Sequence, residues 1–318
     1  MTANAVDDAS ENIHRVLGEF DLRSTQVELL SSTGHCHAKI AADSGNYFLK
    51  ILAPEYAEVQ LQSQMKFADF LRNGGLPVPA PLITMTGHRF ATTIVAGETK
   101  LAVLWPWIDG ETLGDRTETD WIERCGELLA RLHVRSQFYD PPDDFHVRAW
   151  DEVYAPREVG WLRSFLAHSP LDNDAKQIVE RAAARTRTLG SRLPRDRRNY
   201  WLIHADFHGD NLIFDGETIW IVDLEDVGWG HLLFDVAWSA VLFAKHQPGS
   251  GGSLEPLLRG YERIRPFSAA EIALLPEFQL AAGIGAIEMI HTAPIANDDP
   301  LAIEWFDFAV GWLQTHLT

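Results

Sequence analysis

Three polar side chains between positions 206 and 223 have the types and spacing of a site that moves a phosphoryl group. Asp206 precedes Asn211 by five residues, and Asp223 ends an apolar run that follows a tight turn. An amide carbonyl and a carboxylate are oxygen ligands that suit Mg²⁺, which keeps its other positions for water and phosphate oxygens. A second carboxylate nearby, off the metal, can accept a hydroxyl proton. The pattern predicts that Asn211 and Asp223 hold Mg²⁺ and that Asp206 is a general base.

A β-hairpin must bring these residues together. Apolar runs on both sides of Asp215-Gly216 predict that hairpin, because Asp-Gly is a strong turn signal. Folding the chain about this turn places Asn211 beside Asp223, and His204 is expected to brace the preceding loop by hydrogen bonding. Each of these residues alone is equally at home in an ordinary loop or core. The joint pattern of H-x-D-x4-N, a hairpin and a final aspartate is what indicates function.

The elements around this hairpin predict an α+β fold with two lobes. Apolar runs at 36–41 and 47–52 predict a first hairpin, and helical spacing predicts a helix over 57–73. From about residue 120 the pattern is mainly helical. A change near residue 108 predicts a boundary there. We expect further strands at 89–95 and 101–107, helices at 155–168, 173–189, 232–245, 254–263, 268–292 and 300–316, and lobes spanning 1–107 and 108–318.

The composition limits the classes of molecule that the protein can bind and the compartment in which it is expected. Lys and Arg number 27 against 45 Asp and Glu, so the formal net charge is −18, which argues against nucleic acid and permits a cationic small molecule. No apolar run approaches the ~18 residues of a membrane span. Only two cysteines occur and the N-terminus has no secretory pattern, so we expect a cytoplasmic protein without a disulfide framework. Nothing in the sequence indicates an oligomeric state.

The segments HADFHGDN, IWIVDLEDVGWG and FDVAW resemble those of the aminoglycoside phosphotransferase and choline kinase superfamily. That resemblance covers nearly the whole chain and implies a two-lobed, protein-kinase-like fold with a small antiparallel β-rich N-lobe and a larger helical C-lobe. It implies that Asp206 is the catalytic base and that Asn211 and Asp223 bind Mg²⁺. It also implies that Asp235 supports the catalytic loop. For His208 two roles stay open: contact with the transferred phosphate or the acceptor, or only shaping of the loop.

The resemblance implies ATP as the phosphate donor, bound by the N-terminal lobe. Lys50 lies inside an apolar strand, where a charge is costly without a partner, and the resemblance makes it the lysine that contacts the ATP phosphates. We expect four further residues at ATP: Ser32 and Gly34 in a turn over the phosphates, and Trp105 and Trp107 near the adenine.

One position departs from the family pattern. The helix after the lysine strand usually carries a glutamate that pairs with the lysine, and Gln64 stands there in this chain. Its position on the apolar stripe predicts that Gln64 faces inward. Its amide oxygen can accept a hydrogen bond from Lys50, but a neutral acceptor binds a cation more weakly than a carboxylate does.

The acceptor is expected in the helical lobe near Asp206. Acidic and tryptophan side chains suit an ammonium group through charge and cation–π contact, although tryptophans are more often core residues. The candidate acceptor residues are Glu225, Asp226, Trp229, Glu288 and Trp305.

Transfer of the ATP γ-phosphate to a hydroxyl of a small metabolite or antibiotic is the leading hypothesis. A nucleotide-binding pseudokinase or regulatory module is the main alternative, and Gln64 is its only support. A protein Ser/Thr kinase is less favoured, because only a dozen residues separate Asp223 from Asp235. A metal hydrolase built on His204, Asp206, His208 and Asp210 is a third reading.

Overall fold

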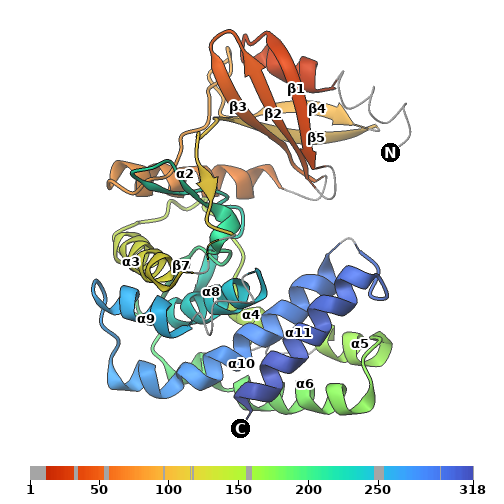
Figure 1. Cartoon of the computed structure of the whole chain (residues 1–318), viewed down its shortest axis with the longest axis vertical. Helices are drawn as coiled ribbons and strands as arrows, with labels where there is room; N and C mark the ends of the chain where they lie inside the picture. Colours follow the sequence, from red (N-terminus) through yellow and green to blue (C-terminus); the bar gives the residue numbers. More distant parts are fainter. Residues whose placement is uncertain are drawn as a thin grey trace. The chain divides into compact units, whose positions relative to one another are not determined.

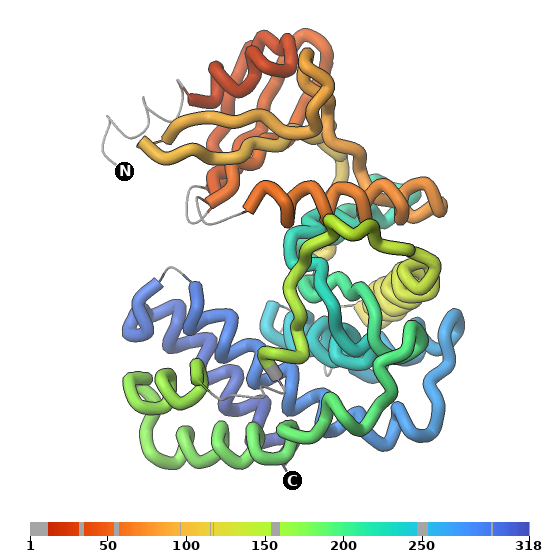
Figure 2. The backbone as a smooth tube through the Cα atoms, turned by 180° about the vertical axis from the view of Figure 1, so that it is seen from behind, coloured from red at the N-terminus to blue at the C-terminus, as the bar shows by residue number. Residues whose placement is uncertain are grey.

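The computed structural model describes residues 12–31, 35–53, 57–95, 97–114, 116, 118–154, 160–246, 254–293 and 295–317. The chain divides into two compact units, which Figures 1 and 2 show from opposite sides. Unit 1 comprises Met1–Glu111, Asp143–His146 and Asp215–Trp220, and unit 2 comprises Thr112–Pro142, Val147–Phe214 and Ile221–Thr318. The assignment of functional lobes to 1–107 and 108–318 stays a prediction.

Unit 1 contains a five-stranded antiparallel sheet with the order β1-β2-β3-β5-β4. Its strands are β1 Ser24–Ser31, β2 Cys36–Ala42, β3 Gly45–Ile51, β4 Ala91–Val95 and β5 Glu98–Pro106. The predicted hairpin between β2 and β3 is confirmed, and Gly45 at its turn has a φ of 135°, which side-chain-bearing residues rarely adopt.

Alternation along the strands gives the sheet two buried faces. Ala102 and Leu104 of β5 pack with the helical residues 12–19, whereas Leu101 and Val103 pack on the side of helix α2, Glu58–Asn73. Leu49 and Ile51 of β3 belong to the first face. Because neighbouring residues of a strand point to opposite faces, Lys50 points to the face that α2 covers.

Helix α2 confirms the helix predicted over 57–73. Leu61 and Met65, one turn apart, anchor it on the sheet, and Gln64 on the same helix is buried, as its place on the apolar stripe predicts. Gly74 caps the helix and Gly75, with a φ of 86°, turns the chain away.

Unit 2 is mainly helical. Its described helices are α3 Thr119–Ser136, α4 Asp151–Tyr154, α5 Gly160–His168, α6 Asn173–Thr186, α7 Leu189–Arg192, α8 Leu232–His246, α9 Leu254–Glu262, α10 Ala269–Thr292 and α11 Pro300–His316. The helix predicted over 155–168 is described only as α5, with α4 before it, because residues 155–159 lie outside the described part of the chain.

Helix α10 lies at the centre of unit 2, against α11, α8 and α6 (Figures 1 and 2). A capping box between Ser268 and Glu271 begins it. Among the described helices, α10 alone is long and apolar enough to span a membrane, and 61% of its apolar window is buried in the protein, as expected of a core helix.

A small β region precedes α8. It contains β7 Tyr200–Ile203, a 3₁₀ turn at Gly209–Asn211, β8 Leu212–Phe214, β9 Ile219–Ile221 and β10 Gly228–His231, and β8 lies between β6, Glu111–Thr112, and β9. Strand β10, antiparallel to β7, was not predicted. Its two glycines allow close packing that a side chain would prevent. A Cβ on Gly228 would lie 2.5 Å from the Arg148 carbonyl oxygen, and one on Gly230 would lie 2.4 Å from Ile203.

Helices α3 and α9 approach each other closely at two glycines. A Cβ on Gly126 would lie 2.1 Å from the carbonyl oxygen of Leu257, and one on Gly260 would lie 1.8 Å from that of Glu123. Both distances are far inside van der Waals contact, so only glycine permits this spacing.

We predict that Gly126→Ala lowers the free energy of unfolding by about 1–3 kcal/mol, because the helices must move apart to admit the methyl group. Gly311→Ala in α11, where an added Cβ meets no atom within 4 Å, is the control, and we expect it to be neutral or stabilising by up to ~1 kcal/mol. Urea unfolding measures both. Equal effects of the two substitutions would contradict the steric argument.

Candidate active site

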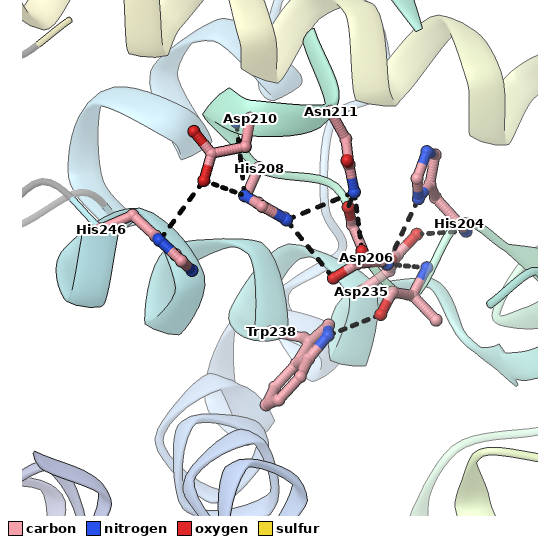
Figure 3. Close-up of polar contacts among 9 residues, drawn as sticks. His204, Asp206, His208, Asp210, Asn211, Asp235, Trp238 and His246 are labelled. Carbon is pink, nitrogen blue, oxygen red and sulfur yellow. Dashed lines mark hydrogen bonds and ion pairs between the residues drawn. The ribbon is translucent and has the colours of Figure 1, made fainter. Parts of the chain in front are cut away.

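The loop that follows β7 is held by a buried carboxylate. Asp235, in the first turn of α8, accepts hydrogen bonds from the backbone N–H groups of His204 and Ala205, both at 2.8 Å. His133 Nε2 lies 2.9 Å from the same carboxylate (Figure 3 shows the loop side of these contacts). Asp235 and both histidines have no exposed surface. The carboxylate therefore fixes the backbone directly before Asp206.

A buried hydrogen-bond chain supports Asp235 from behind. Burial lowers the pKa of His133, so the imidazole is neutral near pH 7. Because a carboxylate only accepts, His133 donates from Nε2, and Nδ1 accepts from the Tyr261 hydroxyl at 2.7 Å. Burial raises the pKa of Tyr261, so the hydroxyl keeps its proton. The close approach of α3 and α9 places Tyr261 and His133 in contact.

Ala205 has a left-handed backbone, with a φ of 62°, which costs a residue with a Cβ about 1–2 kcal/mol. Its N–H is bound by Asp235, and its carbonyl oxygen accepts a 2.6 Å hydrogen bond from Trp238 Nε1. Both sides of the strained residue are thus held by α8. The left-handed conformation of Ala205 changes the direction of the chain between the end of β7 and Asp206.

Asn211 orients Asp206. Its amide nitrogen donates to the Asp206 carboxylate at 2.6 Å and to the Asp206 carbonyl oxygen at 3.0 Å (Figure 3). His204 Nδ1 accepts the Asp206 N–H at 3.2 Å, which is the kind of bracing contact expected of it. These bonds use the side-chain amide hydrogens of Asn211 and leave its side-chain oxygen, Oδ1, as the group that can face a cation.

The predicted hairpin between β8 and β9 is confirmed, with the predicted register. The Val222 N–H donates to the backbone carbonyl oxygen of Asn211 at 3.0 Å, so Asn211 and Asp223 lie at the same end of the hairpin. At the other end, hydrogen bonds from the backbone of Thr218 and Glu217 lower the pKa of Asp215. Asp215 is therefore a turn former.

The loop after the hairpin concentrates negative charge. The side chain of Asp226 reaches solvent, yet desolvation by surrounding atoms, and then repulsion from Asp206 and Asp223, raise its pKa well above the usual range. A divalent cation relieves such repulsion. The oxygen donors of Asn211 and Asp223 are hard ligands, and this donor set fits Mg²⁺.

His208 lies between Asp206 and a second group of polar side chains. Its Nε2 is 3.6 Å from Asp206 Oδ1, and its ring stacks on His246 with centroids 4.9 Å apart (Figure 3). Burial alone lowers the pKa of His208, but the hydrogen bond to Asp206 and the charges of Asp206 and Asp210 outweigh it, so the pKa is raised. For His246, burial dominates and the pKa is lowered.

The alternative of a metal hydrolase assumed a set of metal ligands that the structure does not bring together. His204 is fully buried and its Nδ1 accepts the Asp206 N–H, so it does not join a metal cluster. Within the described ranges, His208 and Asp210 gather with His246 instead. The sequence did not single out His246.

The residues expected at ATP lie in unit 1. Lys50 and Gln64 are 4% and 3% exposed. The Trp107 ring lies under Lys39 Nζ at 4.1 Å. The backbone N–H of Trp107 donates to the Asn46 carbonyl oxygen at 2.9 Å, so this donor is already used. Trp105 lies beside Phe48. Ser32 and Gly34 lie outside the described residues.

The candidate acceptor residues have different surroundings. Trp229, on β10, contacts Trp201 edge to face, and Glu225 is half-buried. Glu288 is buried and pairs with Arg148 at 2.6 Å. Trp305 lies in the core beside His246. Their role in binding an acceptor stays a prediction.

Two supporting residues were missed at the sequence level. His133 had a usable signal, because it follows Leu129 by one turn on the apolar stripe of α3, where a polar side chain needs a buried partner. Arg148 stands in an irregular segment with no such pattern.

An antiparallel sheet, a helical unit and a catalytic-type loop anchored by an aspartate of the next helix define a phosphotransferase of the kinase-like class. Residues 38–272 match the Phosphotransferase enzyme family, and the chain belongs to that family. It is therefore a small-molecule kinase, which uses ATP to phosphorylate a hydroxyl group. The predicted family, fold class and activity class are confirmed.

The relatives include enzymes with different acceptors. A homoserine kinase of Pseudomonas aeruginosa PAO1 is 28% identical over 289 residues, which cover 86% of this chain and 84% of the relative. The microcompartment-associated aminopropanol kinase has a similar structure, with a TM-score of 0.80 at 21% identity over 96% of both chains. Amicoumacin kinase hAmiN, solved with AMP-PNP, Ca²⁺ and Ami, has a TM-score of 0.76 at 17% identity, over 98% of this chain and 96% of that one.

We predict that Asp235→Asn lowers the free energy of unfolding by about 2–4 kcal/mol, because an amide NH₂ faces donors that need an acceptor. Turnover should fall at least tenfold (about 1.4 kcal/mol), since Asp206 loses its fixed backbone. Asp299→Asn is the control, because Asn caps the N-terminus of α11 as well as Asp does. Similar losses in both variants would argue against an anchoring role.

Acid should destabilise this fold. Burial lowers the pKa of His133, His204 and His231, that of His231 to about 4. The unfolded chain, with histidine pKa values near 6.5, binds more protons below that pH. Stability is thus full above about pH 6.5 and falls toward pH 4. His231 alone contributes ~3 kcal/mol to this loss. Urea midpoints against pH should slope less in His231→Gln, and an unchanged slope would refute the assignment.

Proposed function

We propose that this chain uses ATP with Mg²⁺ to phosphorylate the hydroxyl of a small acceptor that carries an ammonium group. The observation that carries the proposal is the pairing of Asp206 with Asn211 at 2.6 Å, on a backbone that Asp235 fixes and at the hairpin end that presents Asp223.

Asp206 has the position and the freedom of a general base. Asn211 donates to Oδ2, and Oδ1, which has His208 Nε2 3.6 Å away, can still accept the hydrogen bond of the acceptor hydroxyl. The acceptor oxygen forms a bond to the γ-phosphorus, the bond from that phosphorus to the bridging oxygen of ADP breaks, and Asp206 receives the hydroxyl proton. Asn211 and Asp223 would hold Mg²⁺, which neutralises charge on the phosphate oxygens when bound.

Lys50 is proposed to neutralise ATP phosphates. It is a buried cation on the sheet face that α2 covers, and a buried cation is stable only with a partner of suitable charge or polarity. Gln64, buried on α2, supplies an amide where the family pattern has a glutamate. The neutral side chain weakens the restraint on Lys50 without removing its charge.

An ammonium-bearing acceptor fits the charge of the chain. The net charge is −18, and Glu225 and Asp226 lie two and three residues after Asp223, the aspartate proposed to bind the metal. The names of two relatives, homoserine kinase and aminopropanol kinase, specify acceptors with both an amine and a hydroxyl. Both cysteines are free, which fits a reducing cytoplasm, where ATP is present.

We predict that Asp206→Asn lowers kcat by about 10²–10⁴-fold, because the amide cannot take the hydroxyl proton. It should still bind MgATP, whereas Asp223→Ala should lose the Mg²⁺ dependence of nucleotide binding. ADP release with a panel of amino alcohols and hydroxy amino acids measures turnover, and calorimetry measures binding. Asp215→Asn, at the hairpin turn, is the matched control and should keep activity.

Wild-type turnover in Asp206→Asn at saturating substrate would show that the base is assigned wrongly. Wild type that binds MgATP but phosphorylates nothing in the panel would favour the pseudokinase alternative. In that case Gln64→Glu distinguishes the causes: turnover gained by this variant identifies the missing glutamate as the reason.

A further inference from the structure

We propose that His208, Asp210 and His246 form a second metal site, suited to Zn²⁺, on the edge of the catalytic loop. Asp210 Oδ2 lies 3.4 Å from His246 Nδ1 and 3.8 Å from His208 Nδ1, and the three ligand atoms all lie within 4.8 Å of one another (Figure 3). Ligand atoms around a tetrahedral zinc stand about 3.3 Å apart, so the three ligand atoms must move closer together to complete the set.

The carboxylate of Asp210 fits against Gly114, where only a glycine leaves room for it. A Cβ on Gly114 would lie 1.9 Å from Asp210 Oδ1, so Asp210 occupies space that any other residue at 114 would fill. Leu113 and Gly209 hold the two segments together through a 3.0 Å hydrogen bond from N–H to carbonyl. With Oδ1 against Gly114, the other oxygen, Oδ2, is the one near both imidazoles.

Ring orientation decides which ligand moves. The imidazoles are nearly parallel, 13° apart, and a metal lies close to the plane of each ring that binds it. One ring must therefore turn. His246 is the last residue of α8 and its side chain is 34% exposed, whereas that of His208 is 10% exposed and contacts Asp206 and Asn211. His246 is the ligand that turns.

Donor type separates this site from the Mg²⁺ site. Imidazole nitrogens favour Zn²⁺, Cu²⁺ and Ni²⁺, whereas amide and carboxylate oxygens favour Mg²⁺. Asn211 and Asp223 offer only oxygens, and the second site offers two imidazoles with one carboxylate. Three protein ligands leave a fourth tetrahedral position for water.

Zinc here should inhibit phosphotransfer, a consequence that rests on the proposed function, whereas the binding itself does not. A metal on Nδ1 of His208 leaves the ring proton on Nε2. That nitrogen lies 3.6 Å from Asp206 Oδ1, the oxygen proposed to accept the hydroxyl proton. Zinc replaces the hydrogen bond that His208 Nδ1 accepts from the Asp210 N–H and makes Nε2–H a stronger donor to this oxygen. Asp206 then becomes a weaker base, so kcat falls.

Binding is tested by calorimetric titration of ZnCl₂ into untagged, metal-free protein. Wild type should bind one Zn²⁺ at micromolar concentration or below, and His246→Ala should bind at least tenfold more weakly. His168→Ala removes an exposed histidine of α5 and should bind as wild type does. Co²⁺ in place of Zn²⁺ should give the strong visible absorption of tetrahedral cobalt in wild type only. Absence of zinc binding, or equal binding by His246→Ala, overturns the site.

Activity is the second measurement. With MgATP and an acceptor, Zn²⁺ should lower turnover of wild type at least tenfold and spare His246→Ala, whose turnover without zinc should equal that of wild type. The variant also controls for zinc bound to ATP. Zinc that binds without inhibiting overturns the coupling to Asp206. If no acceptor is phosphorylated, the proposed function fails, and the calorimetry still decides the metal site.

Discussion

The arrangement of the catalytic loop depends on the buried carboxylate of Asp235. A charge without exposed surface is stable only if hydrogen bonds replace its water, and here two backbone N–H groups and His133 do so. The same bonds hold Ala205 in a left-handed conformation. One set of hydrogen bonds thus offsets both the cost of desolvating the carboxylate and the strain of the loop. These bonds fix the backbone that positions Asp206.

Helix packing reaches the site through this carboxylate. The glycines at 126 and 260 let α3 and α9 approach, and that approach places the Tyr261 hydroxyl on His133. In a low-dielectric interior each hydrogen bond of such a chain strengthens the next. Directional hydrogen bonds, rather than apolar packing, therefore connect the α3–α9 crossing to Asp206. Hydrogen bonds tolerate small displacements less well than apolar contacts do.

The sequence predicted what local signals encode. The Asp-Gly turn fixed the register of β8 and β9, and the 57–73 stripe located α2, because both patterns lie within a few residues. Strand β10 was not predicted because its two glycines have low strand propensity and are present to allow close packing. The contact of His133 with Tyr261 spans 128 residues, and no local pattern carries a partner at that separation. The residues proposed to bind ATP and acceptor remain predictions, since their ligands define them.

The loop after β7 places two kinds of group that can bind a cation within a few residues. Asn211 turns its amide nitrogen to Asp206 and keeps an oxygen, while His208 and Asp210 face His246 at the end of α8. Charge alone attracts any cation to so acidic a surface. Discrimination between Mg²⁺ and Zn²⁺ must then come from the ligand atoms, which are oxygens at Asn211 and Asp223 and mainly imidazole nitrogens at the proposed zinc site. His208 belongs to the zinc site and also lies beside Asp206, so through this residue zinc can act on the base.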